Sequence, residues 1–178
     1  MFNIAEKVAL VTRGASVIGL ACVKEFLKHG AKGITIADIN KNSATRVIDD
    51  LNNVFGNDKL IFAEVDVTHK KQFDDGFILT VEKFRNLDIL VNNVGVFDEQ
   101  NWEKTIAINV NGYIIGNLLG FETYISKYKN GPEGVIINMC SRNSVDAKRN
   151  TTTKFGVLGL SRSFGVKTHY ERRKIKVI

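Results

Sequence analysis

Short apolar runs alternate along this chain with longer segments whose apolar residues recur at helical spacing. Some of the short runs, such as 8–11 and 89–91, are apolar at every position, which is typical of parallel strands covered on both faces. This alternation predicts right-handed β–α–β units and a doubly wound parallel α/β sheet with helices on both faces, ending after a sixth strand. The predicted strands are Lys7–Thr12, Gly33–Asp38, Lys59–Val67, Leu87–Asn93, Gly134–Ser141 and Lys174–Ile178.

Size and composition are those of one globular domain. With 178 residues, of which 44% are hydrophobic and 25% charged, the chain can bury its own core, so we expect a single domain over 1–178. No apolar run approaches the roughly 18 residues of a membrane span, and Met1–Lys7 lacks the layout of a signal peptide. Cys22 and Cys140 lie in apolar segments, which favours a reducing cytoplasmic setting without a membrane partner.

The positive charge of the chain is concentrated near its end. The net charge is +6, yet 142–178 holds ten basic and two acidic residues, which leaves a charge of −2 on the rest. An interaction with nucleic acid would depend on Lys167–Lys176, which offers one aromatic side chain, Tyr170, and no nucleic-acid motif. We interpret this segment as a solvated helix end and expect no nucleic-acid partner.

The end of the first predicted strand resembles a phosphate cradle. The small-residue turn Thr12–Gly19 leads into a helix, whose N-terminal N–H groups and dipole favour an anion. Asp38 ends the second strand, where a carboxylate accepts hydrogen bonds from ribose hydroxyls and repels a 2′-phosphate, so NAD is favoured over NADP. Asp66 lies at the end of the third strand and is placed to face the adenine edge. The alternatives are a helix N-cap for Asp38 and a strand terminator for Asp66.

Motifs at successive strand ends carry a resemblance to a known family. They are Thr12–Gly19, Asn92–Gly95, Asn138–Ser141, and Asn101–Thr105 followed by Ile108 and Asn109. Over essentially its whole length the chain resembles the short-chain dehydrogenase/reductase family, and within it the 15-hydroxyprostaglandin dehydrogenase branch. The resemblance implies a Rossmann-type NAD(P)-binding domain, NAD as cofactor and the oxidation of a secondary alcohol.

The resemblance also assigns site residues. In the family a Tyr is the base, a Lys four residues later binds the nicotinamide ribose, a Ser orients the substrate oxygen, and a helix Asn holds a proton-relay water. Ser141, Asn109 and Lys154 match the Ser, the Asn and the Lys. The implied cofactor-binding residues are Thr12, Gly14, Ser16, Ile18, Gly19, Asp38, Ile39, Asp66, Val67, Asn93, Gly95 and Lys154. The implied partners are a small-molecule alcohol or ketone and a second copy, paired through the long helices near 102–127 and 152–170.

The glycine turn departs from the family pattern at two positions. Arg13 stands at the first glycine, which supplies the tight turn, and Val17 at the second, which lets the backbone approach the pyrophosphate. The branched side chain of Val17 would resist a positive φ and would occupy the place of phosphate oxygens. These two substitutions put the affinity for NAD in question, unless Arg13 lends its own charge to a phosphate.

The catalytic segment departs as well. Asn150 occupies the Tyr position, and an amide has no ionisable proton with which to act as a base. The segment between Ser141 and Lys154 is about four residues shorter than the segment between the matching Ser and Lys of the family pattern. Of the other tyrosines, Tyr113, one helical turn past Asn109, is the better alternative base, since Tyr170 would lie roughly 24 Å from Lys154 along the same predicted helix. A metal site is not expected, because His29 and His69 have no candidate ligands nearby in the sequence.

Two function hypotheses follow. The first is an NAD-dependent oxidoreductase of the 15-hydroxyprostaglandin type with impaired activity. The second is a catalytically inactive relative that acts as a binding or oligomerisation partner, or an incomplete gene product. The resemblance further implies a substrate lobe and a seventh strand after the sixth, and neither is in this sequence.

Overall fold

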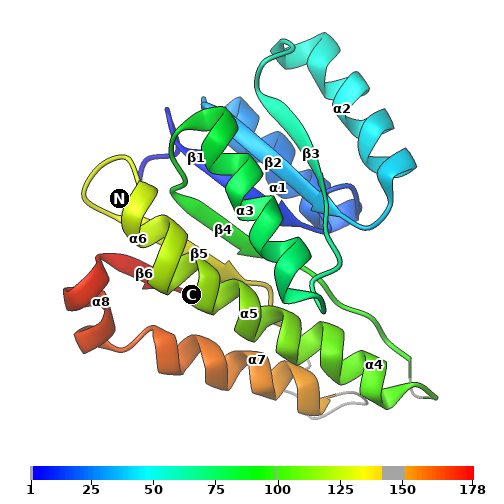
Figure 1. Ribbon diagram of the computed structural model, residues 1–178, viewed down its shortest axis with the longest axis vertical. Coiled ribbons are helices and arrows are strands. Elements are labelled where there is room, and N and C mark those ends of the chain that lie inside the picture. Colours follow the sequence, from blue (N-terminus) through cyan, green and yellow to red (C-terminus); the bar gives the residue numbers. More distant parts are fainter. Residues whose placement is uncertain (1, 99, 142–150) are drawn as a thin grey trace.

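Six parallel strands form one sheet in the computed structural model, which describes residues 2–98, 100–141 and 151–178 (Figure 1). The order across the sheet is β3-β2-β1-β4-β5-β6. The strands are β1 (Val8–Thr12), β2 (Gly33–Asp38), β3 (Leu60–Glu64), β4 (Ile89–Asn92), β5 (Gly134–Asn138) and β6 (Ile175–Val177). The predicted α/β class and all six strands are therefore confirmed.

The strand order reverses between β1 and β4. The chain runs from β1 outward to β2 and β3, returns to β4 on the other side of β1, and then continues outward to β5 and β6. Parallel sheets of this kind bind ligands outside the carboxyl ends of the strands, at the point of reversal. Thr12 ends β1 and Asn92 ends β4, so the predicted motifs lie at this point.

Two strands end three residues earlier than expected, while β4 and β6 end one residue earlier. β3 stops at Glu64 instead of residue 67, because Asp66 Oδ1 accepts hydrogen bonds from the N–H (2.9 Å) and the hydroxyl (2.7 Å) of Thr68 and turns the chain. β5 stops at Asn138 instead of residue 141, and Met139 still donates its N–H to the Asn92 carbonyl at 2.9 Å. The polar residues that follow β3 and β5 thus lie just beyond the hydrogen-bonded part of these strands, at the carboxyl edge of the sheet.

Helices cover both faces of the sheet (Figure 1). On one face lie α1 (Val17–Lys28) and α2 (Lys41–Phe55). The other face carries α3 (Lys70–Phe84), a long rod and α7 (Thr151–Phe164). The rod is one helical run made of α4 (Trp102–Ile106), η1 (Ala107–Asn111), α5 (Gly112–Leu118), η2 (Leu119–Tyr124) and α6 (Ile125–Tyr128), in which η1 and η2 are π-helical.

Alternate side chains of the central strand feed the two cores. Val8 and Leu10 join the core beneath α3 and the rod, which is rich in aromatic residues. Ala9 and Val11 join the core beneath α1 and α2. All four are fully buried, as expected for a strand with helices on both faces.

The prediction of one last helix near 152–170 is wrong in one respect. The segment forms two helices, α7 and the short helix α8 (Lys167–Arg173). The break falls at Gly165, where a Cβ would lie 2.9 Å from the carbonyl oxygens of both Ser161 and Val177. The close approach of the backbone to β6 at this point needs a residue without a side chain. Among the described residues, no helix has both the length and the apolar character needed to cross a membrane.

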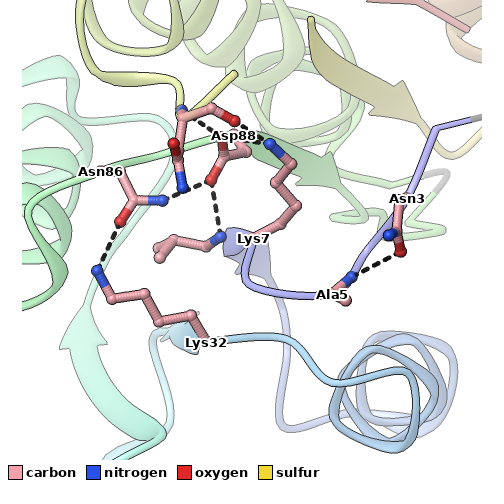
Figure 2. A network of polar contacts seen from close by, with 8 residues as sticks. Asn3, Ala5, Lys7, Lys32, Asn86 and Asp88 are labelled. Atoms are coloured by element: carbon pink, nitrogen blue, oxygen red, sulfur yellow. Dashed lines mark hydrogen bonds and ion pairs between the residues drawn. The ribbon is translucent and has the colours of Figure 1, made fainter. Parts of the chain in front are cut away.

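A buried carboxylate, that of Asp88, joins the amino ends of strands of the sheet (Figure 2). Asp88 Oδ2 accepts from the N–H of Val8 at 2.9 Å and from the Asn86 side chain at 2.7 Å. Lys7 Nζ lies 3.5 Å from Asp88 Oδ1, and Lys32 Nζ donates to the side-chain Oδ1 of Asn86 at 3.0 Å. These contacts tie the segments that lead into β1, β2 and β4 to one side chain.

Candidate dinucleotide cleft

Two cavities lie side by side at the carboxyl edge of the sheet. The larger, about 510 Å³, is bordered by the ends of β2 and β3 and by α4. The smaller, about 330 Å³, is bordered by the start of α1, the end of β5 and α7. Arg13, Val94 and Gly95 line both cavities, so they form the boundary between them.

The turn after β1 keeps the tight packing that a glycine turn provides. A Cβ at Gly19 would lie 2.3 Å from the Arg13 carbonyl oxygen and 2.8 Å from the Asn93 amide nitrogen, and one at Gly14 would lie 2.9 Å from the Val11 carbonyl oxygen. Larger residues at these positions would push α1 away from β1. The last glycine of such turns serves to keep the helix packed closely against the strand. These two predicted glycines therefore hold the shape of the cradle.

The two replaced glycines have different backbone conformations. Arg13 has φ +50°, in the left-handed region, which costs a non-glycine residue about 1–2 kcal/mol. Val17 begins α1 and has no positive φ, so the expectation of backbone strain there is wrong. Its side chain is 87% exposed and lines the smaller cavity, as the steric argument requires.

The Arg13 side chain crosses the cleft. Its Nη1 donates a 2.6 Å hydrogen bond to the carbonyl oxygen of Gly95, in the loop after β4. The Arg13 carbonyl oxygen accepts from the N–H of Ser16 at 3.2 Å and from its hydroxyl at 3.0 Å. Both ends of this residue are thus held, one in the turn and one across the boundary between the cavities.

Asp38 lies on the wall of the larger cavity and is 8% exposed. Its Oδ2 accepts from the N–H of Ala15 at 3.2 Å, and its Oδ1 accepts from the N–H of Asn40 at 3.0 Å. Asn40, whose side chain accepts from Ser43, is the N-cap of α2, so the alternative interpretation of Asp38 as a helix cap is wrong. The neighbouring Ile39, also predicted in the site, is exposed and lines the same cavity.

Asp66 and Val67 line the far wall of the larger cavity. Burial raises the pKa of the Asp66 carboxyl, but the hydrogen bonds from Thr68 and the nearby His69 outweigh it, and the net pKa is below the usual value. His69 Nδ1 lies 3.2 Å from Asp66 Oδ2. Asp66 therefore both turns the chain and presents a carboxylate to the cavity.

Thr12 and Asn93 join the ends of β1 and β4. The Thr12 hydroxyl donates to the Val91 carbonyl at 3.2 Å and accepts from the N–H of Asn93 at 2.8 Å. Thr12 is fully buried behind the cavity walls, whereas Asn93 lines the smaller cavity. Thr12 therefore supports the walls of the site by linking the ends of the two strands, and it does not itself line either of the two cavities.

Ser16 and Ile18, two more predicted cofactor residues, line the smaller cavity beside Val17.

Lys154 and Ser141 share the smaller cavity. Lys154 Nζ donates to the Met139 carbonyl at 3.0 Å, and burial lowers the pKa of its ammonium group. Gly95 faces both this lysine and Asn109, since a Cβ built there would lie 3.7 Å from Lys154 Nζ and 3.8 Å from Asn109 Oδ1. The predicted Ser and Lys therefore meet at the end of the cleft away from Asp38.

Asn109 lies in the π-helical segment η1 and is buried. Its Oδ1 accepts from the N–H of Val96 at 2.8 Å, and its Nδ2 donates to the Val96 carbonyl at 2.8 Å. The side chain also lies 3.4 Å from the Thr153 hydroxyl. Asn109 thus joins the loop after β4 to Thr153 at the start of α7, one residue before Lys154.

The contacts of both tyrosines argue against a role as base, although Tyr113 lines the smaller cavity with Lys154. Tyr113 is fully buried, its hydroxyl lies 2.8 Å and 3.0 Å from the Val94 and Met139 carbonyl oxygens, and burial raises its pKa far above the usual value. The Tyr170 hydroxyl bonds to Glu133, and its pKa is also raised, first by that bond. Asn150, at the predicted position of the base, lies outside the described residues.

Sequence reasoning missed a buried group of amides behind the smaller cavity. Asn138 Oδ1 accepts from Asn92 Nδ2 at 2.9 Å and from Asn117 Nδ2 at 2.8 Å. Asn138 Nδ2 also contacts the Ser161 hydroxyl at 3.0 Å. The signal in the sequence was Asn117, a polar residue inside the apolar stripe of a long helix. Lys104, which lines the larger cavity from α4, was also missed.

Comparison with known proteins agrees with this geometry. The family model described as short chain dehydrogenase matches residues 7–178. The chain is 39% identical to 15-hydroxyprostaglandin dehydrogenase [NAD(+)] of Mus musculus over 165 residues, which are 90% of this chain and 61% of that protein. The chain belongs to the short-chain dehydrogenase family. It spans about three-fifths of the length of the prostaglandin dehydrogenases it matches.

Solved structures show the same fold. A short-chain dehydrogenase from Novosphingobium aromaticivorans superposes with a TM-score of 0.86 at 25% identity, covering 99% of this chain and 68% of the other. A second, from Burkholderia phymatum and in complex with NAD, gives 0.88 at 20% identity, covering 99% and 65%. The reversal of strand order that forms the cleft is therefore a shared property of this architecture.

The residues of the cleft fit the adenosine half of a dinucleotide better than its pyrophosphate. The larger cavity has the volume and the carboxylate of Asp38 that an adenosine needs. The passage toward Lys154 is crossed by the bond between Arg13 and Gly95, and the Val17 side chain projects into the smaller cavity. The residues thus fit the adenosine half as they stand, and the middle of a dinucleotide does not fit while Arg13 holds Gly95. Within the described ranges, no group of His, Cys, Asp and Glu side chains could hold a metal ion.

Proposed function

We propose that this protein binds NAD(H) through its adenosine half and is an oxidoreductase of low turnover on a secondary alcohol or the matching ketone. The observation that carries the proposal is the position of Asp38 and Lys154 at opposite ends of one cleft at the carboxyl edge of the sheet. The similarity to prostaglandin dehydrogenases, whose name includes NAD(+), supports the substrate type and the cofactor.

Asp38 supports a preference for NAD over NADP. Each of its oxygens already accepts one backbone N–H, and a carboxylate oxygen has a second lone pair to offer a ribose hydroxyl. A 2′-phosphate at the same place would meet a buried negative charge, which is costly without a cation beside it. We therefore expect NADH to bind more tightly than NADPH, and replacement of Asp38 by Ser to narrow the difference.

Ser141 and Lys154 would hold the reacting end of the substrate. NAD supplies the hydride acceptor when it is bound. The Ser141 hydroxyl can donate a hydrogen bond to the substrate oxygen, and the Lys154 ammonium favours a negative charge developing there. Burial lowers the pKa of Lys154, so a larger fraction of its amine is neutral near physiological pH than in an exposed lysine.

Low turnover follows from Asn150. An amide cannot take the proton of an alcohol, and the absence of a general base typically lowers a rate by about 10²- to 10⁴-fold. Burial and two carbonyl partners keep Tyr113 protonated, so it supplies no substitute.

The experiment is a comparison of wild type, Asn150→Tyr and Asn150→Phe for NADH formation on a panel of secondary alcohols. We expect slow NADH formation by wild type, a higher rate in Asn150→Tyr, and no increase over wild type in Asn150→Phe, which matches the size of Tyr without its hydroxyl. Equal rates for Asn150→Tyr and Asn150→Phe would contradict the role assigned to this position.

The second candidate function, a binding or oligomerisation partner, is favoured by exposed apolar side chains on the long helices. Ile114 and Leu118 on α5 and Phe155 on α7 are all exposed, and a groove of about 220 Å³ lies between the two helices. We propose that a second copy covers this face. Sedimentation should show a dimer that Phe155→Glu converts to a monomer, whereas a monomeric wild type would contradict the proposal.

A further inference from the structure

We propose that Arg13 divides the cleft and makes its larger cavity a site for an adenine mononucleotide, so that ADP binds at least as tightly as NAD. The inference rests on the proposed function, because it uses the adenosine site that the proposal assigns. It differs in naming the ligand class that the cleft accepts with Arg13 in its present position.

The backbone of Arg13 is held in one conformation by its contacts. Its backbone has φ +50°, and its carbonyl oxygen accepts three hydrogen bonds, from the N–H and hydroxyl of Ser16 and from the Asn93 side chain at 3.4 Å. The Cβ of a residue at 19 would meet the same carbonyl oxygen, so α1 packs directly against it. The direction in which the Arg13 side chain leaves the turn is therefore set by the fold.

The guanidinium group reaches the opposite wall. Nη1 lies 2.6 Å from the Gly95 carbonyl oxygen, a short distance typical of a charged donor. Arg13 and Gly95 are two of the three residues that line both cavities. A ligand that extends from Asp38 to Lys154 has to pass between these cavities and must displace the Arg13 side chain, whereas a ligand confined to the larger cavity does not.

The larger cavity has the charges that a mononucleotide needs. Asp38 and Asp66 offer acceptors to ribose hydroxyls and to an adenine amino group. Arg13 and Lys104 also line this cavity and bring two positive charges for the phosphates. The donors that Arg13 does not use on Gly95 remain available to a terminal phosphate, since a guanidinium has five N–H groups.

The experiment measures binding by calorimetry, with ADP, NAD⁺ and NADH as ligands. The proteins are wild type, Arg13→Gly and Arg13→Asn; both substitutes tolerate the left-handed backbone, so at least one should fold, which circular dichroism checks. Arg46→Ala, on the exposed face of α2, controls for the loss of one positive charge. We expect wild type and Arg46→Ala to bind ADP at least as tightly as NAD⁺.

In the two Arg13 variants we expect the affinity for NAD⁺ to rise about tenfold relative to that for ADP, which corresponds to about 1.4 kcal/mol. Tighter binding of NAD⁺ than of ADP by wild type, or a loss of NAD⁺ affinity in the variants, would overturn this inference and leave the proposed function standing. Absence of binding by all three ligands to every variant would overturn both.

Discussion

Arg13 and Val17 replace two glycines of the same turn, and their environments explain why only one of them strains the backbone. The sequence indicates that both positions are unusual, because the surrounding motif is intact. It does not indicate where the chain enters the helix, and this decides that Val17 takes a helical φ while Arg13 takes a left-handed one. The reach of Arg13 to Gly95 was not predictable either, since it depends on the spacing of two loops 82 residues apart.

Tyr113→Phe tests whether this tyrosine is only structural. Its hydroxyl contacts two backbone carbonyl oxygens, and burial keeps it protonated, so we expect a loss of stability of about 1–2 kcal/mol in urea unfolding. We expect little change in the affinity for NADH or in any alcohol oxidation. Abolished oxidation with unchanged folding would instead identify Tyr113 as the base.

Lys154 should be chemically distinct from exposed lysines. Burial lowers its pKa, whereas the neighbouring Asp75 raises the pKa of Lys71 on α3. Because only the neutral amine is acylated, modification of Lys154 should begin at a lower pH than that of Lys71, as followed by mass spectrometry. The lowered pKa also affects stability. The unfolded chain binds the Lys154 proton more tightly than the folded protein does, so the contribution of Lys154 to the free energy of unfolding rises with pH between its folded and unfolded pKa values. A later onset for Lys154 than for Lys71 would contradict its burial in the cleft.

At the scale of elements, the periodicity of apolar residues predicted most helices well. The long helix over 102–127 is observed as one run, and its apolar stripe packs on the sheet. The two π-helical stretches within it were not predictable, because they depend on where its side chains meet β4 and the loop after it. The division of the last helix at Gly165 was missed because an isolated glycine is tolerated in a helical pattern, and only the contact with β6 shows why the helix ends there.

The three buried asparagines bind the elements behind the smaller cavity together. Asn138→Ala removes the shared acceptor and leaves the amides of Asn92 and Asn117 without this partner, so we expect unfolding to become easier by about 2–3 kcal/mol. Asn53→Ala, at an exposed position of α2, is the matched control and should change stability little. Equal effects of the two substitutions would show that the amide group is not a stabilising contact.

At the scale of the molecule, the doubly wound parallel class was predictable from the alternation of strand and helix patterns, whereas the order of the strands is known only from the structure. The concentration of basic residues near the end of the chain was also correctly located, and several of them have acidic partners. Arg172 and Arg173 each contact Glu122 at 2.6 Å, and Lys176 contacts Glu133 at 2.8 Å. These pairs neutralise part of the positive charge of the segment. That it is a solvated helix end without a nucleic-acid partner stays a prediction, and a nucleic-acid column that retained the protein at moderate salt would contradict it.

The carboxylate network at the amino edge should matter to the stability of the whole sheet (Figure 2). Asp88→Ala removes the acceptor of the Val8 and Asn86 donors and leaves Lys7 without its carboxylate partner, so we expect a loss of about 3–5 kcal/mol. Asp75→Ala, which removes an exposed carboxylate paired with Lys71, is the control and should leave the melting temperature almost unchanged. A loss as small as that of the control would contradict the assigned role.

The central claim is that the carboxyl edge of the sheet still binds an adenine dinucleotide through its adenosine half. Calorimetric titration of the wild-type protein with NADH, and in parallel with NADPH, tests it most directly. We expect NADH to bind in the micromolar range and NADPH to bind more weakly, because the buried carboxylate of Asp38 lines the cavity that would hold the ribose. No detectable binding of NADH, or a preference for NADPH, would contradict it.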